Sequence, residues 1–464
     1  MATIPEFQTN GYEIKRTITA FFKEYRVGQL LRKSNANKTK GVPVACVFLY
    51  LVELVFTKKS MYMNILNGTN PAGFAKDVIY RLLNATFINW SAYLLHLSKA
   101  VIAHIASLTS EERLHALIID DSVFERPRSK KVELLANVHD HAATGKNKFK
   151  RGFRMLTLAW SDGTTTIPML FRHLSSKERK NRYNKINPDI DKRTVGYKIR
   201  REAMESATTL LLSMLAQAKK IVAPAKHVVF DSWFSYPSTM MSVKKIGFDA
   251  VGRLKDTTKI KYLVDGQKQT LKQIYAGAKK RPGRAKYLLS REVLLYNDDG
   301  ETTPARLIFV RDRNNRKKWI AFGATDMALS EEEIIQLYSK RWDIEVMFKI
   351  CKSYLKLADE FQGLSYDSIT AHTTVVMTRY IILATQKRQN EDPRSLGELF
   401  HLLYDEVADI QFSDALALIL TLLREVLNDC LFLTKTQIGE IIEGFVAKLS
   451  SCFSAFFIPS TRYL

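Results

Sequence analysis

The chain has 464 residues, 46% of them hydrophobic and 25% charged, which is enough apolar side chain for several folded domains. Its 70 Lys and Arg against 47 Asp and Glu give a formal net charge of +23 at pH 7, so nucleic acid is the first partner to consider. The four Cys residues lack C-x-x-C spacing, which argues against both a disulfide framework and a zinc site.

Neither a signal peptide nor a membrane span is indicated. The N-terminus has no basic region followed by an apolar stretch, and the longest apolar run, residues 42–56, is too short to cross a bilayer. We therefore expect a cytoplasmic protein with no membrane partner.

The positive charge is concentrated in the first 360 residues. Residues 172–201 hold eleven basic and three acidic side chains, and residues 253–291 hold twelve basic and two acidic ones. Residues 361–464 hold eight basic and twelve acidic side chains, so this segment is net negative. We expect the polyanion-binding surface to lie before residue 361.

Residues 1–107 are predicted to be helical. Apolar residues recur at helical spacing in TITAFFKEYRVGQLLRK and in VIYRLLNATFINWSAYLLHLSKAVIAHIASL. With thirteen basic and five acidic residues, this segment fits a small helical DNA-binding domain.

From residue 108 the pattern changes to alternating strands and helices. The runs ALIID and HVVFD are continuous apolar strands that each end in an acidic residue, as expected for strands covered on both faces. Between them lie a predicted hairpin around the turn SDG and a predicted helix over about residues 198–220. A helix closed by Gly247 and the strand DAVGRL follow. These elements predict a mixed α/β layer over residues 108–254.

The α/β layer is then interrupted and resumed. Residues 255–328 alternate Gly- and Lys-rich pieces with strand-like runs, which predicts a β-rich insertion. A long helix begins at Ser330, where Ser330 and Glu333 form a predicted capping box, and it belongs to the second part of the core, residues 329–362. Residues 363–464 are predicted to be helical, and their amphipathic run DALALILTLLREVLNDCLFL is a candidate for self-association.

The helix that begins at Ser330 carries a narrow polar stripe on an otherwise apolar circumference. At about 100° per residue, five polar side chains fall within roughly 80° of one another. These side chains are Tyr338, Arg341, Glu345, Lys349 and Lys352. Charged groups in such a slot need partners, because desolvating them unpaired is costly. An internal Arg341–Glu345 ion pair on an ordinary helix is the alternative explanation.

Three acidic positions that are far apart in the chain can meet at this helix. Asp120 and Asp121 end one apolar strand run, Asp231 ends another, and Glu345 lies on the helix. Carboxylates placed together repel one another unless cations neutralise them, and their oxygen ligands suit Mg²⁺. Two such ions can activate a nucleophile and stabilise the leaving oxygen in phosphoryl transfer. Taken singly, each strand-end Asp is more simply explained as a turn or cap residue.

The polar stripe also resembles a known signature. Tyr338-x-x-Arg341-x-x-x-Glu345-x-x-x-x-x-x-Lys352 is similar to the Tyr-Arg-Glu-Lys signature of bacterial DDE transposases of insertion-sequence family four. The resemblance covers roughly residues 114–360 and implies an RNase H-like catalytic core. From this and the residue patterns, we expect the core to be interrupted by the β-rich insertion and flanked by helical N- and C-terminal regions. The resemblance also implies cut-and-paste transposition with two Mg²⁺ ions, for which Mn²⁺ would substitute.

The resemblance implies a catalytic, metal-binding triad of Asp121, Asp231 and Glu345. The family's first Asp is commonly followed by Thr or Ser, which favours Asp121 over Asp120. Since neighbouring residues on a strand point to opposite faces, only one of these two should serve.

Five further residues are candidates for DNA binding. By resemblance, Tyr338, Arg341 and Lys352 would hold phosphates near the cleaved end, with Arg suited to a bidentate grip. Trp319 resembles a tryptophan that stacks on a flipped base in hairpin-forming members, and a core Trp on a strand is an equal alternative. Arg253 could also face DNA, with a solvated basic residue as the simpler explanation.

We therefore predict a DNA transposase that cuts at the terminal inverted repeats of a mobile element and joins the freed 3′-hydroxyl to target DNA. It would act as a homodimer on double-stranded DNA in the bacterial nucleoid. The sequence leaves open whether the reaction passes through a hairpin intermediate. Two other classes remain. One is a catalytically silent, transposase-derived DNA-binding protein, and the other is an RNase H-like structure-specific nuclease that cuts without joining.

Overall fold

The computed structural model describes residues 11–57, 60–66, 73–110, 113–140, 148–221, 224–282, 285–312, 315, 318–389, 427, 434 and 436–441. Within it, Thr9–Asp392 form one compact unit, to which the following description applies. The candidate self-association run in the C-terminal region lies, apart from one residue, outside the described residues. In the described part of the chain no helix is both long enough and apolar enough to cross a membrane.

Helices precede the first strand, as predicted. They are α1 (Gly11–Glu24), α2 (Val27–Lys33), α3 (Val44–Leu54), η1 (Val55–Thr57), α4 (Met61–Leu66), α5 (Lys76–Leu83) and α6 (Trp90–Ser107). The apolar run that was too short for a bilayer forms α3, a core helix. Its Phe48 is fully buried, with ring centroids 5.7 Å from Trp90 and 5.2 Å from Tyr93.

Eleven strands of the described residues form one mixed sheet. They are β1 (Ala116–Glu125), β2 (Ala136–His139), β3 (Phe149–Ser161), β4 (Thr166–Leu174), β5 (His227–Phe230), β6 (Asp249–Arg253), β7 (Tyr262–Val264), β8 (Gln267–Gln269), β9 (Leu289–Tyr296), β10 (Thr302–Arg311) and β11 (Trp319–Ala324). The order is β2-β3-β1-β5-β6-β11-β10-β9-β7-β8, and β4 pairs with β3.

Five of these strands form an RNase H-like core. β4, β3 and β1 pair antiparallel, and β5 and β6 continue the sheet parallel to β1. The resulting order, β4-β3-β1-β5-β6, places the first strand in the centre, with the antiparallel strands on one side and the parallel strands on the other. The predicted mixed α/β, RNase H-like fold is confirmed.

The segment that was predicted to be a β-rich insertion extends this sheet. β11 pairs antiparallel with β6, and β10 and β9 follow in antiparallel order. The short helix α10 (Leu271–Gly277) begins with a capping box between Thr270 and Gln273. The inserted strands therefore lie in the same sheet as the core strands.

Two predicted helices are each divided. The helix expected over residues 198–220 is α7 (Val195–Glu202) and α8 (Ala207–Lys219), because the Ser206 side chain accepts the Thr209 N–H and starts a new helix. The long helix after Ser330 is α11 (Glu331–Ser339) and α12 (Arg341–Ser353), which meet at Lys340. The predicted capping box of Ser330 and Glu333 is present.

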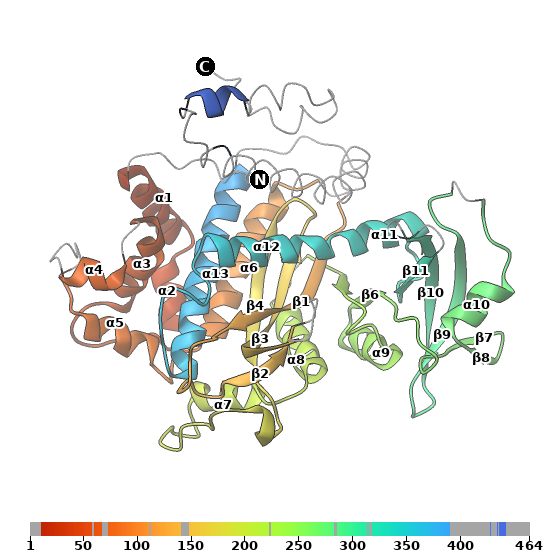
Figure 1. Cartoon of the computed structure of the whole chain (residues 1–464), viewed down its shortest axis with the longest axis horizontal. Helices are drawn as coiled ribbons and strands as arrows, with labels where there is room; N and C mark the ends of the chain where they lie inside the picture. The colour runs from red at the N-terminus through yellow and green to blue at the C-terminus, as the bar shows by residue number, and fades with distance from the viewer. Residues whose placement is uncertain are drawn as a thin grey trace. The chain divides into compact units, whose positions relative to one another are not determined.

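The two faces of the sheet are covered by different helices. One face of the sheet carries the apolar residues Ala116, Val229 and Val251. They form an apolar cluster with Ile334 and Leu337 of α11. Figure 1 shows α11 and α12 running from the inserted strands towards β1. α9 (Pro237–Ile246) ends at Gly247, whose φ of 95° fits a glycine C-cap, as predicted. It packs with α8 and β6.

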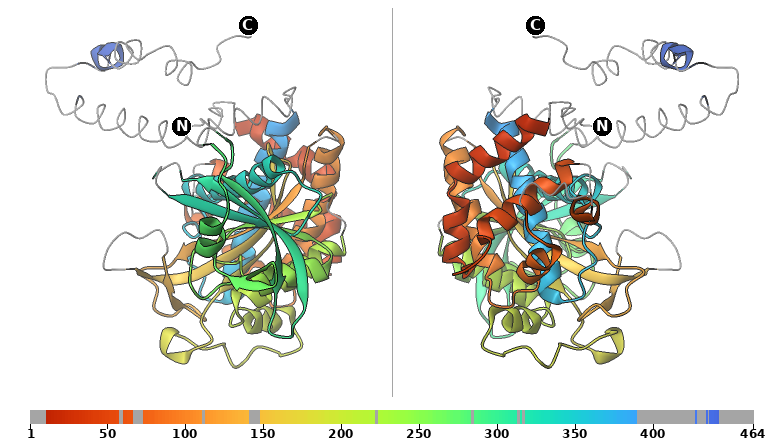
Figure 2. Two further views of the ribbon diagram at one scale, coloured as in Figure 1. Left: turned by 90° about the vertical axis from the view of Figure 1, so that its right-hand side faces the viewer. Right: turned by 90° about the vertical axis from the view of Figure 1, so that its left-hand side faces the viewer.

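The helix α13 (Tyr366–Gln389) lies near the end of this unit in sequence and packs against helices from its beginning. It packs against α3, α5 and α6, and against β4 of the core sheet. Figure 2 (right) shows α13 among the helices of the N-terminal region. Helices separated by more than 250 residues in the chain therefore share one core.

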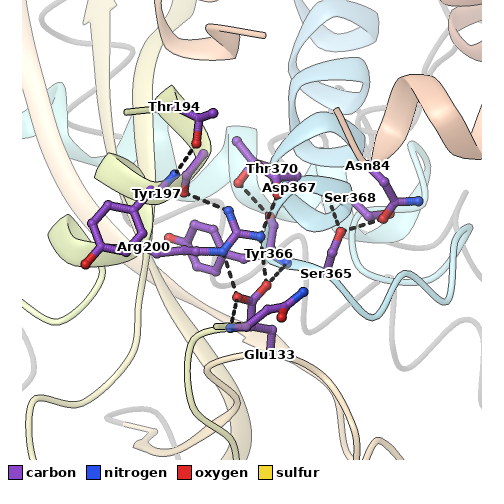
Figure 3. Close-up of polar contacts among 12 residues, drawn as sticks. Asn84, Glu133, Thr194, Tyr197, Arg200, Ser365, Tyr366, Asp367, Ser368 and Thr370 are labelled. Carbon is purple, nitrogen blue, oxygen red and sulfur yellow. Dashed lines mark hydrogen bonds and ion pairs between the residues drawn. The ribbon is translucent and has the colours of Figure 1, made fainter. Parts of the chain in front are cut away.

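A buried ion network fastens α13 to the core (Figure 3). Arg200 of α7 is fully buried, and its Nε and Nη2 donate to the two Glu133 oxygens at 2.7 Å each. Its Nη2 also lies 2.5 Å from Asp367 Oδ2 on α13. Burial alone would raise the pKa of Glu133, but the hydrogen bonds from Arg200 and from the backbone hold that pKa below its usual range.

Replacing Arg200 with Met would leave the carboxylates of Glu133 and Asp367 buried without their shared cation. We expect Arg200→Met to lower the free energy of unfolding by about 3–5 kcal/mol, measured by urea denaturation. The matched control is Arg193→Met, since Arg193 is exposed and pairs with Asp191 at the surface; its effect should stay below about 1 kcal/mol. Equal effects of the two substitutions would contradict the assignment.

The core also holds neutral histidines. His173 lies among aromatic rings, 4.8 Å from Phe124 and 5.3 Å from Phe171 between centroids. Burial, with the nearby positive charges of Arg126 and Arg172 as smaller causes, lowers the pKa of His173 to about 3. The unfolded chain therefore binds a proton at His173 that the folded chain excludes.

Folding stability should therefore fall as the pH drops below about 6.5, by up to about 1.4 kcal/mol per pH unit for each such histidine. Removing the titrating ring in His173→Gln should flatten the dependence of unfolding free energy on pH between about pH 6.5 and 4.5. His96→Gln is the control, because His96 is exposed. A His173→Gln profile parallel to that of the wild type would argue against the neutral buried ring.

Candidate active site

The strand that carries Asp120 and Asp121 continues past both residues. β1 was expected to end at Asp120 or Asp121. It continues to Glu125 instead, because its second half pairs with β3 from Leu156 to Gly152. Its other neighbour, β5, is shorter and ends at Phe230, opposite Ile119. Asp120 therefore lies beside Asp231, the residue that follows β5.

This register decides which carboxylates share a face. Residues directly opposite each other on paired strands point to the same side, and successive residues alternate. Asp120 and Asp231 therefore lie on the face covered by α11, two residues beyond Ile118 and Val229. Asp121 points to the opposite face.

Helix α12 brings a third carboxylate to this face. Arg341 Nη1 lies 2.8 Å from Asp120 Oδ2 and 2.6 Å from Glu345 Oε1. Both contacts are to one nitrogen atom, so the two oxygens are no farther apart than the sum of these distances. The hydrogen bond from Ser161 Oγ to Asp343 Oδ2, 2.7 Å long, holds the first turn of α12 against the end of β3. We call Asp120, Asp231, Glu345 and Arg341 the carboxylate cluster.

The electrostatics of the cluster reflect crowded acidic groups. Burial, together with the negative charges of Asp231 and Asp121, raises the pKa of Asp120 to about 7, although Arg341 opposes the rise. For Arg341, burial would lower the pKa, but Tyr338, Asp120 and Glu345 raise it overall. The guanidinium thus supplies the positive charge that these carboxylates require.

Asp121 belongs to a different set of contacts. Its Oδ2 forms a close ion pair with Arg154 Nη2 of β3. The Arg154 guanidinium carbon also lies 5.6 Å from the centroid of the Trp233 ring. The structure therefore places Asp120 and Asp231 on one face of the sheet, links Asp120 to Glu345 through Arg341, and holds Asp121 on the other side of β1.

A tight turn after β5 orients Asp231. The backbone N–H of Trp233 donates to Asp231 Oδ1 at 2.8 Å, and Ser235 Oγ donates to the Asp231 carbonyl at 2.7 Å. The turn packs closely on β6, where a Cβ at Gly252 would stand 2.2 Å from Ser235 Oγ. Only glycine fits there without moving the turn.

The predicted DNA-binding residues take different positions. Tyr338 packs on Phe322, with 4.4 Å between ring centroids, and lies within electrostatic reach of Asp231 and of Arg253, which is exposed at the end of β6. Lys352 is exposed towards the far end of α12, near Glu125 and Asp140 rather than Asp231.

Trp319 lies in the inserted part of the sheet rather than at the carboxylate cluster. Its ring centroid is 5.2 Å from that of Tyr275 and 5.0 Å from that of Phe309, and the residue is half-buried. This packing agrees with the alternative interpretation of Trp319, that of a core tryptophan on a strand.

The donor set fits a hard divalent cation in its chemistry. The three carboxylates offer only oxygen ligands, which Mg²⁺ prefers. Among the described residues, no three His, Cys, Asp or Glu side chains stand close enough together to hold a metal ion as placed. A guanidinium lies between Asp120 and Glu345 instead, in the position of a cation. Asp120, Asp231 and Glu345 would supply the oxygen ligands of such a site, which requires Arg341 and the carboxylates to move from these positions.

Arg154 and Trp233 were not predicted as site residues. The sequence offers only weak signals for them, because a basic residue in a charged strand and a Trp after a strand are common in ordinary surfaces. Their proximity to Asp121 and Asp231 follows from the pairing of β3, β1 and β5.

Comparison with known proteins gives matches of different strength. Residues 48–288, just over half of the chain, match the family described as DDE superfamily endonuclease. Among solved structures, the Drosophila P element transposase strand transfer complex aligns at 10% identity with a TM-score of 0.23, covering 57% of this chain and 55% of that chain. The alignment thus spans little more than half of that protein. No curated protein matches the chain.

The turn that carries Asp231 can be tested through Gly252. In Gly252→Ala the added methyl would meet Ser235 Oγ at 2.2 Å and the Phe230 ring at 3.1 Å, so we expect a loss of about 1–3 kcal/mol in unfolding free energy. Gly277→Ala is the control, because nothing lies within 4 Å of the added Cβ; it should change stability by less than about 0.5 kcal/mol. Thermal unfolding would be the measurement. A neutral Gly252→Ala would contradict the close packing of this turn.

Proposed function

The chain belongs to the DDE superfamily endonucleases, and we propose that it is a DNA transposase whose catalytic carboxylates are Asp120, Asp231 and Glu345. One observation carries this proposal. Carboxylates from β1, from the end of β5 and from α12 lie on one face of an RNase H-like sheet, and Arg341 bridges two of them. Partly buried carboxylates placed on one face repel one another unless cations neutralise them.

We propose Asp120 as the first catalytic residue in place of Asp121. The resemblance to insertion-sequence family four favoured Asp121 because Ser122 follows it. The side chain of Asp121, however, is engaged by Arg154, and the strand register puts it on the face away from Glu345. The other two members of the predicted triad, Asp231 and Glu345, are retained in the proposal.

Asp120, Asp231 and Glu345 would hold two Mg²⁺ ions, with Mn²⁺ as a substitute. When bound, such ions make a water or a 3′-hydroxyl nucleophilic and stabilise the leaving oxygen of a phosphodiester. The chain's own residues would position the DNA. Arg341, displaced from the carboxylates, would turn to the scissile phosphate, which a guanidinium can grip with two hydrogen bonds.

Neighbouring residues would extend this grip along the DNA. The Tyr338 hydroxyl can donate a hydrogen bond to a phosphate oxygen, and Arg253 lies near Tyr338. Lys352, about seven residues and two turns beyond Glu345, would contact the backbone farther from the cut. We infer that the substrate is double-stranded DNA at terminal inverted repeats, in a bacterial nucleoid. A homodimer would bring together the two ends of the mobile element. Cleavage through a hairpin intermediate is a further proposal.

The test uses a plasmid that carries the coding segment with its natural flanking DNA, and a second plasmid as target. Wild-type protein with Mg²⁺ should cut at the flanks and join the freed ends to the target, and EDTA should abolish both products. Asp120→Asn, Asp231→Asn and Glu345→Gln should each reduce cutting at least about 100-fold, since each removes a proposed metal ligand.

Asp121→Asn is the matched control, because it removes the same group from the adjacent position. It should retain cutting within about 10-fold of wild type. Loss of cutting in Asp121→Asn with activity kept in Asp120→Asn would assign the metal to Asp121. Cut ends that are never joined would favour the structure-specific nuclease, and flank binding without any cutting would favour the catalytically silent protein.

A further inference from the structure

We propose that Lys340 and Asp343 are positioning residues that fix the place of Glu345 in the carboxylate cluster. Both side chains meet the turn of residues 161–165, which links β3 to β4, at the point where α11 passes into α12. We call Lys340, Asp343 and this turn the junction cluster. The inference rests on the proposed function, since it explains how the chain holds one of the proposed metal ligands in place.

The Lys340 ammonium is enclosed by the turn. Lys340 is 8% exposed, and a Cβ on Gly163 would stand 2.4 Å from its Nζ. Gly163 has a φ of 91°, a conformation that favours glycine for a second reason. Burial lowers the pKa of Lys340, while the carboxylates of Asp343 and Asp162 oppose this effect. The ammonium thus fills a place that the missing side chain of Gly163 leaves open.

Asp343 ties the first turn of α12 to the same segment. Ser161 Oγ donates to Asp343 Oδ2 at 2.7 Å, and the backbone N–H of Gly163 donates to Ser161 Oγ at 2.8 Å. Lys340 directly precedes α12 and Asp343 lies in its first turn. Two contacts three residues apart restrain both the tilt of the helix and its rotation about its own axis.

The turn is itself held firmly by the rest of the fold. Asp162 Oδ1 accepts the backbone N–H groups of Thr164 and Thr165, at 2.9 and 2.7 Å. Asp162 Oδ2 accepts the Thr109 hydroxyl, which follows α6, at 2.9 Å and lies 3.3 Å from Arg388 Nη2 of α13. The Asp162 side chain is fully buried. The turn can therefore serve as a fixed support for the start of α12.

The carboxylate of Glu345 depends on this support, because Glu345 lies only two residues beyond Asp343. A helical side chain reaches about 5–6 Å from the helix axis, so a rotation of α12 by about 10° would move this carboxylate by about 1 Å. Metal–ligand distances are fixed to within about 0.2 Å. A misplacement of about 1 Å can slow a reaction about 100-fold. Arg341 begins the same helix and would move together with Glu345.

The first experiment displaces the Lys340 ammonium without changing Lys340. In Gly163→Ala the added methyl competes with Nζ for the same space, so amide hydrogen exchange in the first half of α12 should become about 10-fold faster or more. Mass spectrometry of the full chain would measure the exchange. Gly266→Ala is the matched control, because Gly266 has a φ of 78° and nothing lies within 4 Å of its added Cβ. It introduces the same kind of backbone strain and should leave exchange in α12 unchanged.

A double-mutant cycle assigns the effect to the ammonium. Lys340→Met removes the ammonium and keeps an apolar stem, whose end would replace Lys340 Cε at 3.6 Å from the added Cβ. Lys340→Met alone should also speed exchange in α12. When Gly163→Ala is added to Lys340→Met, exchange in α12 should change little further, because no ammonium is left to displace.

The proposed reaction supplies a second measurement. At saturating DNA and Mg²⁺, Gly163→Ala and Lys340→Met should each cut about 10- to 100-fold more slowly. Their affinity for flanking duplex DNA in EDTA should stay close to that of the wild type, because a buried Lys340 makes no phosphate contact. Asp343→Asn, which keeps an acceptor for Ser161, should lose less cutting activity than Asp343→Ala.

Three results would overturn the proposal. They are wild-type exchange in α12 of Gly163→Ala, equal acceleration in Gly266→Ala, and additive effects of Gly163→Ala and Lys340→Met. Failure of the proposed function would look different, because hydrogen exchange does not require cutting. Faster exchange in α12 of these variants, in a chain that never cuts DNA, would support the junction cluster and reject the transposase. Slower cutting with wild-type exchange in α12 would reject the junction cluster alone.

Discussion

The parallel pairing of β1 with β5 is the constraint on which the proposed chemistry depends. Four backbone pairs, from Ala116 with His227 to Ile119 with Phe230, leave Asp120 and Asp231 side by side where β5 ends. Because strand residues alternate between faces, a shift of one residue would send one carboxylate to the other side of the sheet. The fully buried apolar residues before each acid oppose such a shift. The hydrophobic core thus sets the position of the charged groups.

The helical side of the site depends on a second constraint, the meeting of α11 and α12 at Lys340. Apolar residues of α11 pack on the sheet face that carries Asp120 and Asp231, while the first turn of α12 is tied to β3 through Asp343. Arg341 then begins α12 directly over the carboxylates. The internal Arg341–Glu345 pair, considered first as an ordinary helix feature, is present. It coexists with the contact to Asp120, so the two explanations are not exclusive.

Much of the fold could be predicted because it depends on local patterns. The apolar runs of β1 and β5, the hairpin of β3 and β4, the glycine at the end of α9 and the capping box at Ser330 each have a signal within a few residues. The choice between Asp120 and Asp121 depends instead on pairing between distant strands. Aligning the two apolar runs by their first acidic residues would have matched Asp120 with Asp231. The exposure of Trp233 has no comparable sequence signal, because it results from the depth at which Phe234 and Ser235 are buried.

The position of α13 has a consequence for how the protein is made. The helices of the N-terminal region share their core with a helix that begins at Tyr366, so their apolar surface stays incomplete until most of the chain has left the ribosome. Contacts between such distant segments also slow folding, because a long loop must close before they form. A nascent or shortened chain that ends before this helix would expose apolar surface and would be a natural target for chaperones and proteases.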